Sequence, residues 1–426
     1  MHTNPIDETA LYARVTWRLL PILFLCYVAS YLDRVNVGFA KLQMLNDLKF
    51  SETVYGLGAG IFFIGYFIFE VPSNIALHKV GARLWIARIM ITWALVSAAM
   101  VWVTTPLSFY ILRFLLGAAE AGFFPGVILY LTYWFPAHRR GKITALFMTG
   151  VPISGVIGGP LSGWIGASLP GVYGLAGWQW MFILEAIPSL LLGIVVIIVL
   201  ADGIHSAHWL NDAEKTLLDN NIRREEQSKS TLSARHMLAD SKVWLMAGIY
   251  FCFVMGLYGV SFWLPTLIHN LGVENSAEVG WLTAIPYAVA SITMILLGHS
   301  ADKHRERRWH LAVPALLGGA GLILSALWAH NTLLAMAALS LATAGIISIL
   351  PLFWSLPTAI LGGVAAAAGI ALINSLGNLA GFLSPYLVGW LKDATASTDS
   401  GLFMLAGFLF LGAALTLTTP KQQVNA

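Results

Sequence analysis

Six charged side chains interrupt otherwise apolar stretches in the first half of this sequence: Asp33, Arg34, Glu70, Arg113, Glu120 and Glu185. A buried arginine is a ready two-bond partner for a carboxylate. A buried carboxyl group without a fixed cation can hold a proton at neutral pH, because burial disfavours its charged form. These residue types therefore indicate a site that handles organic anions and protons.

The spacing of these residues indicates how helices would position them. Arg113 and Glu120 are seven residues apart, so two helical turns place them on one face, with Glu120 about 10 Å further along the axis. If the first helix runs outward and the fourth inward, Asp33, Arg34 and Arg113 lie at similar depth. A structural alternative is that Asp33 with Arg34, and Arg113 with Glu120, form ion pairs that only hold the helices together.

The composition places the elements in a membrane. The chain has 426 residues, of which 58% are hydrophobic and 11% charged, and its mean hydropathy is +0.75. So few charges could not cover the surface of a water-soluble protein. We predict an all-α polytopic membrane protein with twelve spanning helices, at about 17–38, 54–77, 84–104, 107–132, 143–167, 179–201, 243–268, 279–299, 310–329, 332–353, 365–390 and 401–418. Charge at the bilayer centre costs at least about 2.5 kcal/mol, so the six charges are expected to be functional or paired.

The helices divide into two halves. We predict an N-terminal six-helix bundle at 1–201, a polar cytoplasmic linker at 202–241 and a C-terminal six-helix bundle at 242–426. Gly159-Pro160 and Ser384-Pro385 each precede a Gly-Trp pair at an offset of 225 residues, which indicates a parallel repeat about an axis normal to the membrane. At offsets of 224 to 225 residues, Asp33, Arg34, Arg113 and Glu120 have only uncharged counterparts, near Leu257, Tyr258, Ala337 and Gly345.

Basic residues predict the orientation. With the N-terminus in the cytoplasm, nineteen lysines and arginines lie on the cytoplasmic side, against Lys41, Lys49 and Lys392 on the other. The positive-inside rule therefore places both termini in the cytoplasm. The net charge of +3 is too small to indicate nucleic-acid binding. Cys26 and Cys252 lie in apolar segments and predict no disulfide, and no metal, cofactor or nucleophile–base set of an enzyme is expected.

Several motifs resemble the major facilitator superfamily over essentially the whole chain. Gly298, Asp302 and Lys303, followed by Arg307-Arg308, look like its loop signature, although the first-half copy has His78 where an aspartate is expected. A narrower resemblance is to the anion:cation symporter family of tartrate, sugar-acid, phthalate and hydroxyphenylacetate permeases. It rests on YLDRVNVGFA at 31–40, FEVPSN at 69–74, RFLLGAAEAGFFPG at 113–126 and GWQWMFILE at 177–185.

The resemblance implies roles for individual residues. Arg113 is expected to bind substrate, and Asp33 and Glu120 are expected to be proton-coupling groups. Arg34 is expected to act as a charge partner in the same site. The depth of Tyr31 and Tyr66, and the i,i+4 spacing of Asn374 and Asn378, favour pocket roles, with interhelical hydrogen bonding as the alternative for the asparagines. The predicted substrate-binding set is thus Arg113, Arg34, Tyr31, Tyr66, Asn374 and Asn378. Gly298, Asp302 and Lys303 are expected to act in gating, and Glu70 and Glu185 to be structural.

Together these features predict a monomeric secondary transporter of a bacterial inner membrane. It would take up a small organic acid anion, such as a tartrate-like acid, a sugar acid or an aromatic carboxylate, with protons by alternating access. Sodium coupling stays open, and the acid itself is not identified. The Gly155 to Gly163 motif, often linked to exporters, leaves a drug/proton antiporter as the alternative, and a membrane sensor or enzyme is the third.

Overall fold

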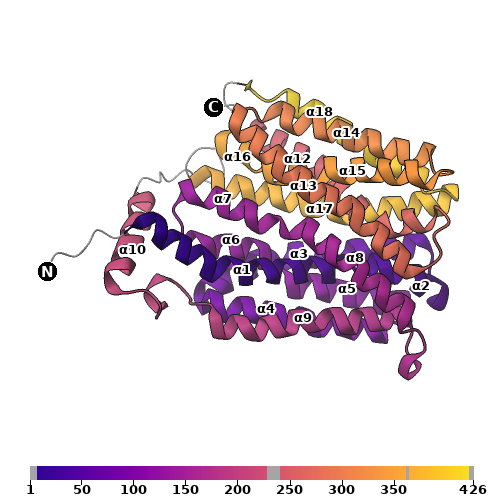
Figure 1. Ribbon diagram of the computed structural model, residues 1–426, viewed down its shortest axis with the longest axis horizontal. Helices are drawn as coiled ribbons and strands as arrows, with labels where there is room; N and C mark the ends of the chain where they lie inside the picture. Colours follow the sequence, from indigo (N-terminus) through magenta and orange to yellow (C-terminus); the bar gives the residue numbers. More distant parts are fainter. Residues whose placement is uncertain (1–6, 228–239, 361–363, 422–426) are drawn as a thin grey trace.

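The computed structural model describes residues 7–227, 240–360 and 364–421, and within these ranges every regular element is a helix (Figure 1). The two ends of the chain lie at the same end of the elongated molecule, which we call the terminal end; we call the opposite one the far end. The long helices run between these two ends.

The first half contains α1 to α9 and two short 3₁₀ turns. Their bounds are α1 (Glu8–Val35), α2 (Val37–Leu48), α3 (Glu52–Val80), α4 (Ala82–Ala99), η1 (Met100–Trp102), α5 (Pro106–Glu120), α6 (Phe123–Thr132), α7 (Ala137–Met148), α8 (Gly150–Ser168), η2 (Val172–Gly174) and α9 (Gly177–Val199). Within this set α4 packs on α9 and α5, α3 on α5, and α1 on α8 and α9.

The second half follows a connecting segment. The segment holds η3 (Ile204–Ser206) and α10 (Asp212–Gln227). The later helices are α12 (Ser241–His269), α13 (Ser276–His304), α14 (Arg308–Leu327), α15 (Thr332–Phe353), α16 (Ser355–Ile360), α17 (Val364–Thr395) and α18 (Asp399–Leu417). Here α14 packs on α15 and α18, α13 on α15, and α12 on α18.

Eleven helical stretches among the described residues are long and apolar enough to cross a membrane. They coincide with eleven of the twelve predicted spans, so the all-α membrane fold is confirmed. The twelfth prediction, 365–390, falls on α17, some of whose side chains lie outside the described part of the chain.

The first helix is longer than its apolar pattern predicts. It begins at Glu8 rather than near residue 17, with the Asp7 side chain accepting hydrogen bonds from the N–H groups of Thr9 and Ala10 at 2.9 and 3.2 Å. The added turns bury Leu11 and Val15 on one face only. A hydropathy window averages over both faces and so starts the segment too late.

The connecting segment docks on the terminal end of the first half. Glu214 of α10 pairs with Arg14 of α1, and Trp209 stacks on Trp134 with ring centroids 5.8 Å apart. Asn221 donates hydrogen bonds of 3.3 Å to Glu8 and to Tyr12. Part of the polar segment predicted as a linker is thus folded against α1 and the α6–α7 turn.

The two halves meet closely at the far end. The α8 helix packs on α13, and α3 packs on α17. A Cβ atom built on Gly280 would lie 2.3 Å from the Gly159 carbonyl oxygen, and one on Gly56 would lie 2.4 Å from that of Pro385. Only glycine permits these backbone contacts, so the small residues of the repeat motifs close the far end.

Candidate substrate-binding and proton-coupling site

An ion pair joins Arg34 of α1 to Glu120 of α5 within the first half. Both side chains are buried, and Ser30 donates a second hydrogen bond of 2.7 Å to the same Glu120 oxygen. Glu120 is the last residue of α5, because the chain leaves helical geometry at Ala121 and turns at Gly122 with a φ of +84°. A Cβ atom at Gly122 would lie 2.5 Å from Ser73 Oγ, so this break needs glycine.

Arg34 also reaches the second half. Its Nη1 donates a hydrogen bond of 2.9 Å to the hydroxyl of Tyr258 on α12. Tyr258 is the counterpart of Arg34 at a repeat offset of 224 residues, so two equivalent positions of the two halves touch. Residues that meet their own counterparts lie close to the axis that relates the halves, which is where transporters of this kind bind substrate.

Aromatic rings surround the Arg34 guanidinium. Its central carbon lies 5.2 Å from the ring centre of Phe62, 5.6 Å from Tyr66 and 5.8 Å from Tyr31. The Tyr31 and Ser261 hydroxyls share a hydrogen bond of 2.9 Å between the halves. Two predicted pocket residues, Tyr31 and Tyr66, therefore lie around one arginine together with Ser261, which the sequence reasoning missed.

The Arg113 side chain is fully buried and is held by backbone carbonyl groups. Its Nε donates to the Gly58 carbonyl at 3.2 Å, and its Nη2 donates to the carbonyls of Ala59 and Arg34 at 3.3 and 3.5 Å. Its Nη1 is buried without a hydrogen-bond partner among the described residues. Arg113 thus supports the backbone beside Arg34 and keeps one nitrogen available for a further acceptor.

Asp33 faces a different side of α1 from Arg34 and forms no ion pair within the described residues. Its carboxylate accepts hydrogen bonds from Trp93 Nε1 at 3.0 Å, Ser97 at 3.2 Å and Ser189 at 2.5 Å. The ion pairs considered as the structural alternative, Asp33 with Arg34 and Arg113 with Glu120, are therefore not those that form. Arg34 pairs with Glu120 instead.

Asn374 and Asn378 both bond to a residue of the first half. They donate hydrogen bonds of 2.8 and 3.0 Å to the two carboxylate oxygens of Glu70 on α3. Glu70 therefore links the two halves, and the amide nitrogens of both asparagines are occupied by its carboxylate. The structure does not bring these three residues into contact with the Arg34–Glu120 pair.

The predicted gating residues lie at the terminal end, away from this site. Asp302 accepts a hydrogen bond of 2.6 Å from Arg307 within the same loop, and a Cβ atom on Gly298 would meet nothing within 4 Å. Lys303 is exposed in the last turn of α13. In the first-half copy, His78 lies 3.0 Å from the Tyr133 hydroxyl.

Three further polar residues of the site escaped the sequence reasoning: Ser30, Tyr258 and Ser261. The repeat offset identified Tyr258 as the counterpart of Arg34. Its role in the site became evident only from the hydrogen bond between the two side chains. Across residues 7–227, 240–360 and 364–421, no group of three His, Cys, Asp or Glu side chains is arranged to hold a metal ion.

Similar proteins were found along the whole chain. A protein of Pseudomonas putida named "Putative metabolite transport protein NicT" is 50% identical over 98% of this chain and 96% of its own length. A protein of Agrobacterium vitis named "Putative tartrate transporter" is 48% identical over 100% of this chain and 94% of its own. A "Quinolone resistance transporter" of Acinetobacter baumannii is 42% identical over 94% of this chain and 93% of its own.

Solved structures show the same fold. The xylose transporter XylE from Escherichia coli, in a partially occluded inward open conformation, matches with a TM-score of 0.74 and 16% identity over 95% of this chain and 98% of its own. The sequence model of the Major Facilitator Superfamily matches residues 23–385. The chain therefore belongs to the Major Facilitator Superfamily and is a multi-pass membrane transporter rather than an enzyme.

Proposed function

We propose that this chain is a monomeric symporter that takes up a small organic acid anion with protons across the bacterial inner membrane, with both termini in the cytoplasm. The observation that carries the proposal is the buried Arg34, bonded to Glu120 on one side and to Tyr258 of the other half. The excess of basic residues at the terminal end supports the orientation. The tartrate transporter name of a relative at 48% identity supports a carboxylate substrate.

The pairing of Arg34 supplies a reason for coupling. The guanidinium has one fixed carboxylate partner, Glu120, in a buried environment. A substrate carboxylate that binds Arg34 beside an ionised Glu120 would place two negative charges around one positive charge, which is costly away from water. Protonation of Glu120 removes that cost. Substrate and proton therefore bind together, and Arg113 Nη1 offers a second donor for the same anion.

The surroundings fit a small, oxygen-rich acid. The Tyr258 hydroxyl is bonded to the cation, the rings of Tyr31 and Tyr66 lie beside it, and the Tyr31 and Ser261 hydroxyls are bonded to each other. A tartrate-like acid or a sugar acid could use these groups for its own hydroxyls, whereas an aromatic carboxylate would stack on the rings. These acids are the proposed substrate class.

Transport in purified proteoliposomes tests the proposal directly. We expect an inward proton gradient to drive accumulation of one or more acids from a panel of tartrate, sugar acids and aromatic acids. A protonophore should abolish accumulation, and replacing sodium by potassium should leave it unchanged. Uptake that ignores the protonophore but requires sodium would contradict the proton assignment.

An ionic cluster at the far end must open if access alternates. Glu52 of α3 lies 2.7 Å from Lys41 Nζ of α2 and 2.5 Å from Lys392 Nζ of α17. Lys41 Nζ lies 3.6 Å from the ring centre of Trp263 on α12, and Asp393 accepts 2.7 Å and 3.3 Å hydrogen bonds from the N–H groups of Thr53 and Glu52. We call Lys41, Glu52 and Lys392 the far-end cluster; it joins the two halves.

Replacing Glu52 with glutamine is expected to open the far end more often. The change leaves two buried or half-buried lysines without a common carboxylate, and a loss of about 1.4 kcal/mol would raise the open population about tenfold. With Thr283→Cys as the reporter, we expect more frequent opening to appear as faster labelling of the cysteine by a membrane-impermeant thiol reagent. Glu274→Gln, an exposed change at the same end, is the control. Equal labelling rates in both variants would contradict a gating role.

Drug efflux is the second candidate function, because a relative at 42% identity carries the name of a quinolone resistance transporter. The same proteoliposomes distinguish the two functions. An antiporter would expel protons as drug enters, whereas the proposed symporter moves proton and acid in the same direction.

A further inference from the structure

A second carboxyl cluster, which the proposed function does not use, lies in the first half. Glu185 of α9 is fully buried, and Ser162 of α8 donates a hydrogen bond of 2.5 Å to its Oε1. Asn36, at the junction of α1 and α2, has a buried side chain beside the same carboxyl group. Among the described residues, neither Glu185 Oε2 nor either polar atom of the Asn36 amide makes a hydrogen bond of 3.5 Å or less.

The unpartnered atoms are best satisfied by a proton. An ionised carboxylate held by one neutral hydroxyl would be costly among membrane-spanning helices, and no ion pair to Glu185 occurs within the described residues. A protonated Glu185 can instead donate from Oε2 to the Asn36 amide oxygen after a small rotation. One proton then satisfies two buried oxygen atoms that otherwise lack partners.

The neighbouring Asp33 strengthens this assignment. Asp33 accepts three hydrogen bonds, one of them from Ser189, which lies one turn from Glu185 on the same face of α9. Three donors stabilise an ionised carboxylate, whereas Glu185 has one hydroxyl donor and the Asn36 amide beside it. Two nearby carboxyl groups repel each other when both are ionised, so the poorly bonded one holds the proton.

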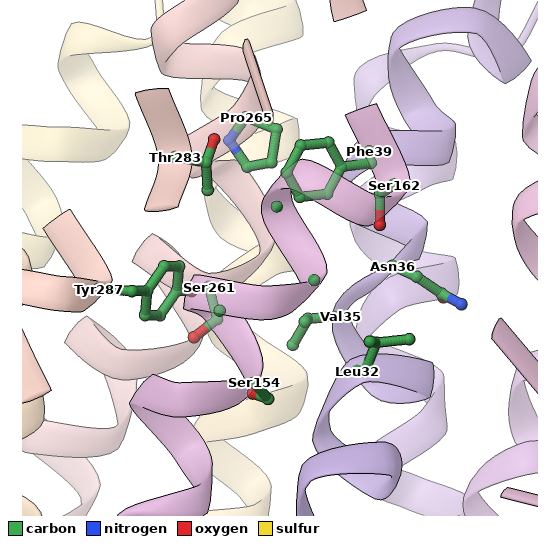
Figure 2. A pocket seen from close by; sticks show the side chains of 13 residues that line it. Leu32, Val35, Asn36, Phe39, Ser154, Ser162, Ser261, Pro265, Thr283 and Tyr287 are labelled. Carbon is green, nitrogen blue, oxygen red and sulfur yellow. The ribbon is translucent and has the colours of Figure 1, made fainter. Parts of the chain in front are cut away.

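A small cavity lies beside the cluster. It has room for about one water molecule, 20 Å³, and its lining includes Asn36 and Ser162 from the first half and Ser261 and Thr283 from the second. Figure 2 shows these residues around it, with the Asn36 amide directed away from Tyr287 and the second half. The contact of Gly159 with Gly280 closes the helices beside this cavity toward the far end. Separation of α8 from α13 would therefore bring water to the cluster.

We infer that Glu185, with Asn36 and Ser162, is a second protonation site of the transport cycle. Its proton leaves Oε2 for water and returns from water as the two halves separate and close. This inference rests on the proposed proton symport. It assigns a titrating role to a residue that the sequence alone indicates as structural.

Measuring the proton-to-substrate ratio of Glu185→Gln in proteoliposomes tests the site. The reversal potential gives the ratio, and counterflow of labelled substrate gives exchange. We expect exchange within about threefold of wild type, because glutamine mimics the protonated acid, and a ratio lower by one proton. An unchanged ratio would overturn the inference and leave Glu185 permanently neutral. A wild-type ratio of zero would instead overturn the proposed symport itself.

Ser162→Ala tests the same point if Glu185→Gln does not fold. This variant keeps the acid and removes its hydrogen-bond donor. The infrared carbonyl stretch of a protonated carboxyl group is expected to shift, and proton-driven uptake is expected to change its pH dependence. The matched change Ser154→Ala alters a serine of α8 whose hydroxyl bonds to the Val151 carbonyl of its own helix. A spectrum unchanged by Ser162→Ala would show that Glu185 does not carry the proton.

Discussion

Replacing Glu120 with glutamine is expected to abolish accumulation of the substrate while exchange continues. Glutamine resembles the protonated acid in size and hydrogen bonding, so Arg34 becomes available to the substrate carboxylate without a proton. Transport that binds no proton at this site cannot draw on the proton gradient, because a gradient acts only through a coupled binding step. The accumulation ratio should then fall to about one, measured as proton-driven uptake beside counterflow in the same proteoliposomes.

A purely structural ion pair predicts a different result for this variant. Arg34 would be buried without its acid, which typically costs about 3–5 kcal/mol and should lower the melting temperature. Glu214→Gln, which breaks the exposed pair with Arg14 at the connecting segment, is a control for loss of charge alone. Lower stability with exchange and accumulation equally reduced would remove Glu120 from the coupling role, and Asp33 would become the next candidate.

Replacing Arg34 with lysine is expected to weaken substrate binding about 10- to 100-fold although the charge remains. Lysine cannot make two parallel hydrogen bonds to a carboxylate, and a lost hydrogen bond to a charged group is worth about 1.5–3 kcal/mol. Lysine would also lose the geometry that joins Glu120 to Tyr258. Calorimetric titration with a transported acid measures the effect.

Replacing Arg113 with lysine distinguishes the role of Arg113 in substrate binding from that of Arg34. If Arg113 Nη1 also holds the anion, the affinity of this variant should fall about as far as that of Arg34→Lys. If its three carbonyl contacts are its whole role, the melting temperature should fall while the affinity of the folded protein stays close to wild type. Near-normal affinity in Arg34→Lys would contradict the proposed substrate contact.

The far-end cluster shows a limit of sequence reasoning. Lys41 and Lys392 count among the few basic residues predicted on the outer side, but they are 351 positions apart and nothing in their local sequence joins them. Packing of α3 on α17 brings Lys392 to Glu52, and contact of α2 with α3 brings Lys41 to the same carboxylate. The sequence therefore identified the two lysines, but it did not predict that both contact Glu52.

The sequence alone determined the helical membrane fold and indicated the buried charges as the candidate site. Apolar length sets the spans, because an unpaired backbone is too costly in a bilayer, and the same cost makes each buried charge conspicuous. Tertiary structure decided which charges meet. Neighbouring residues of a helix point about 100° apart, so Asp33 and Arg34 face different helices, and the break after Glu120 directs it to Arg34 rather than to Arg113. Partner choice depends on helix rotation and on glycine contacts between distant segments, which no local pattern in one chain specifies.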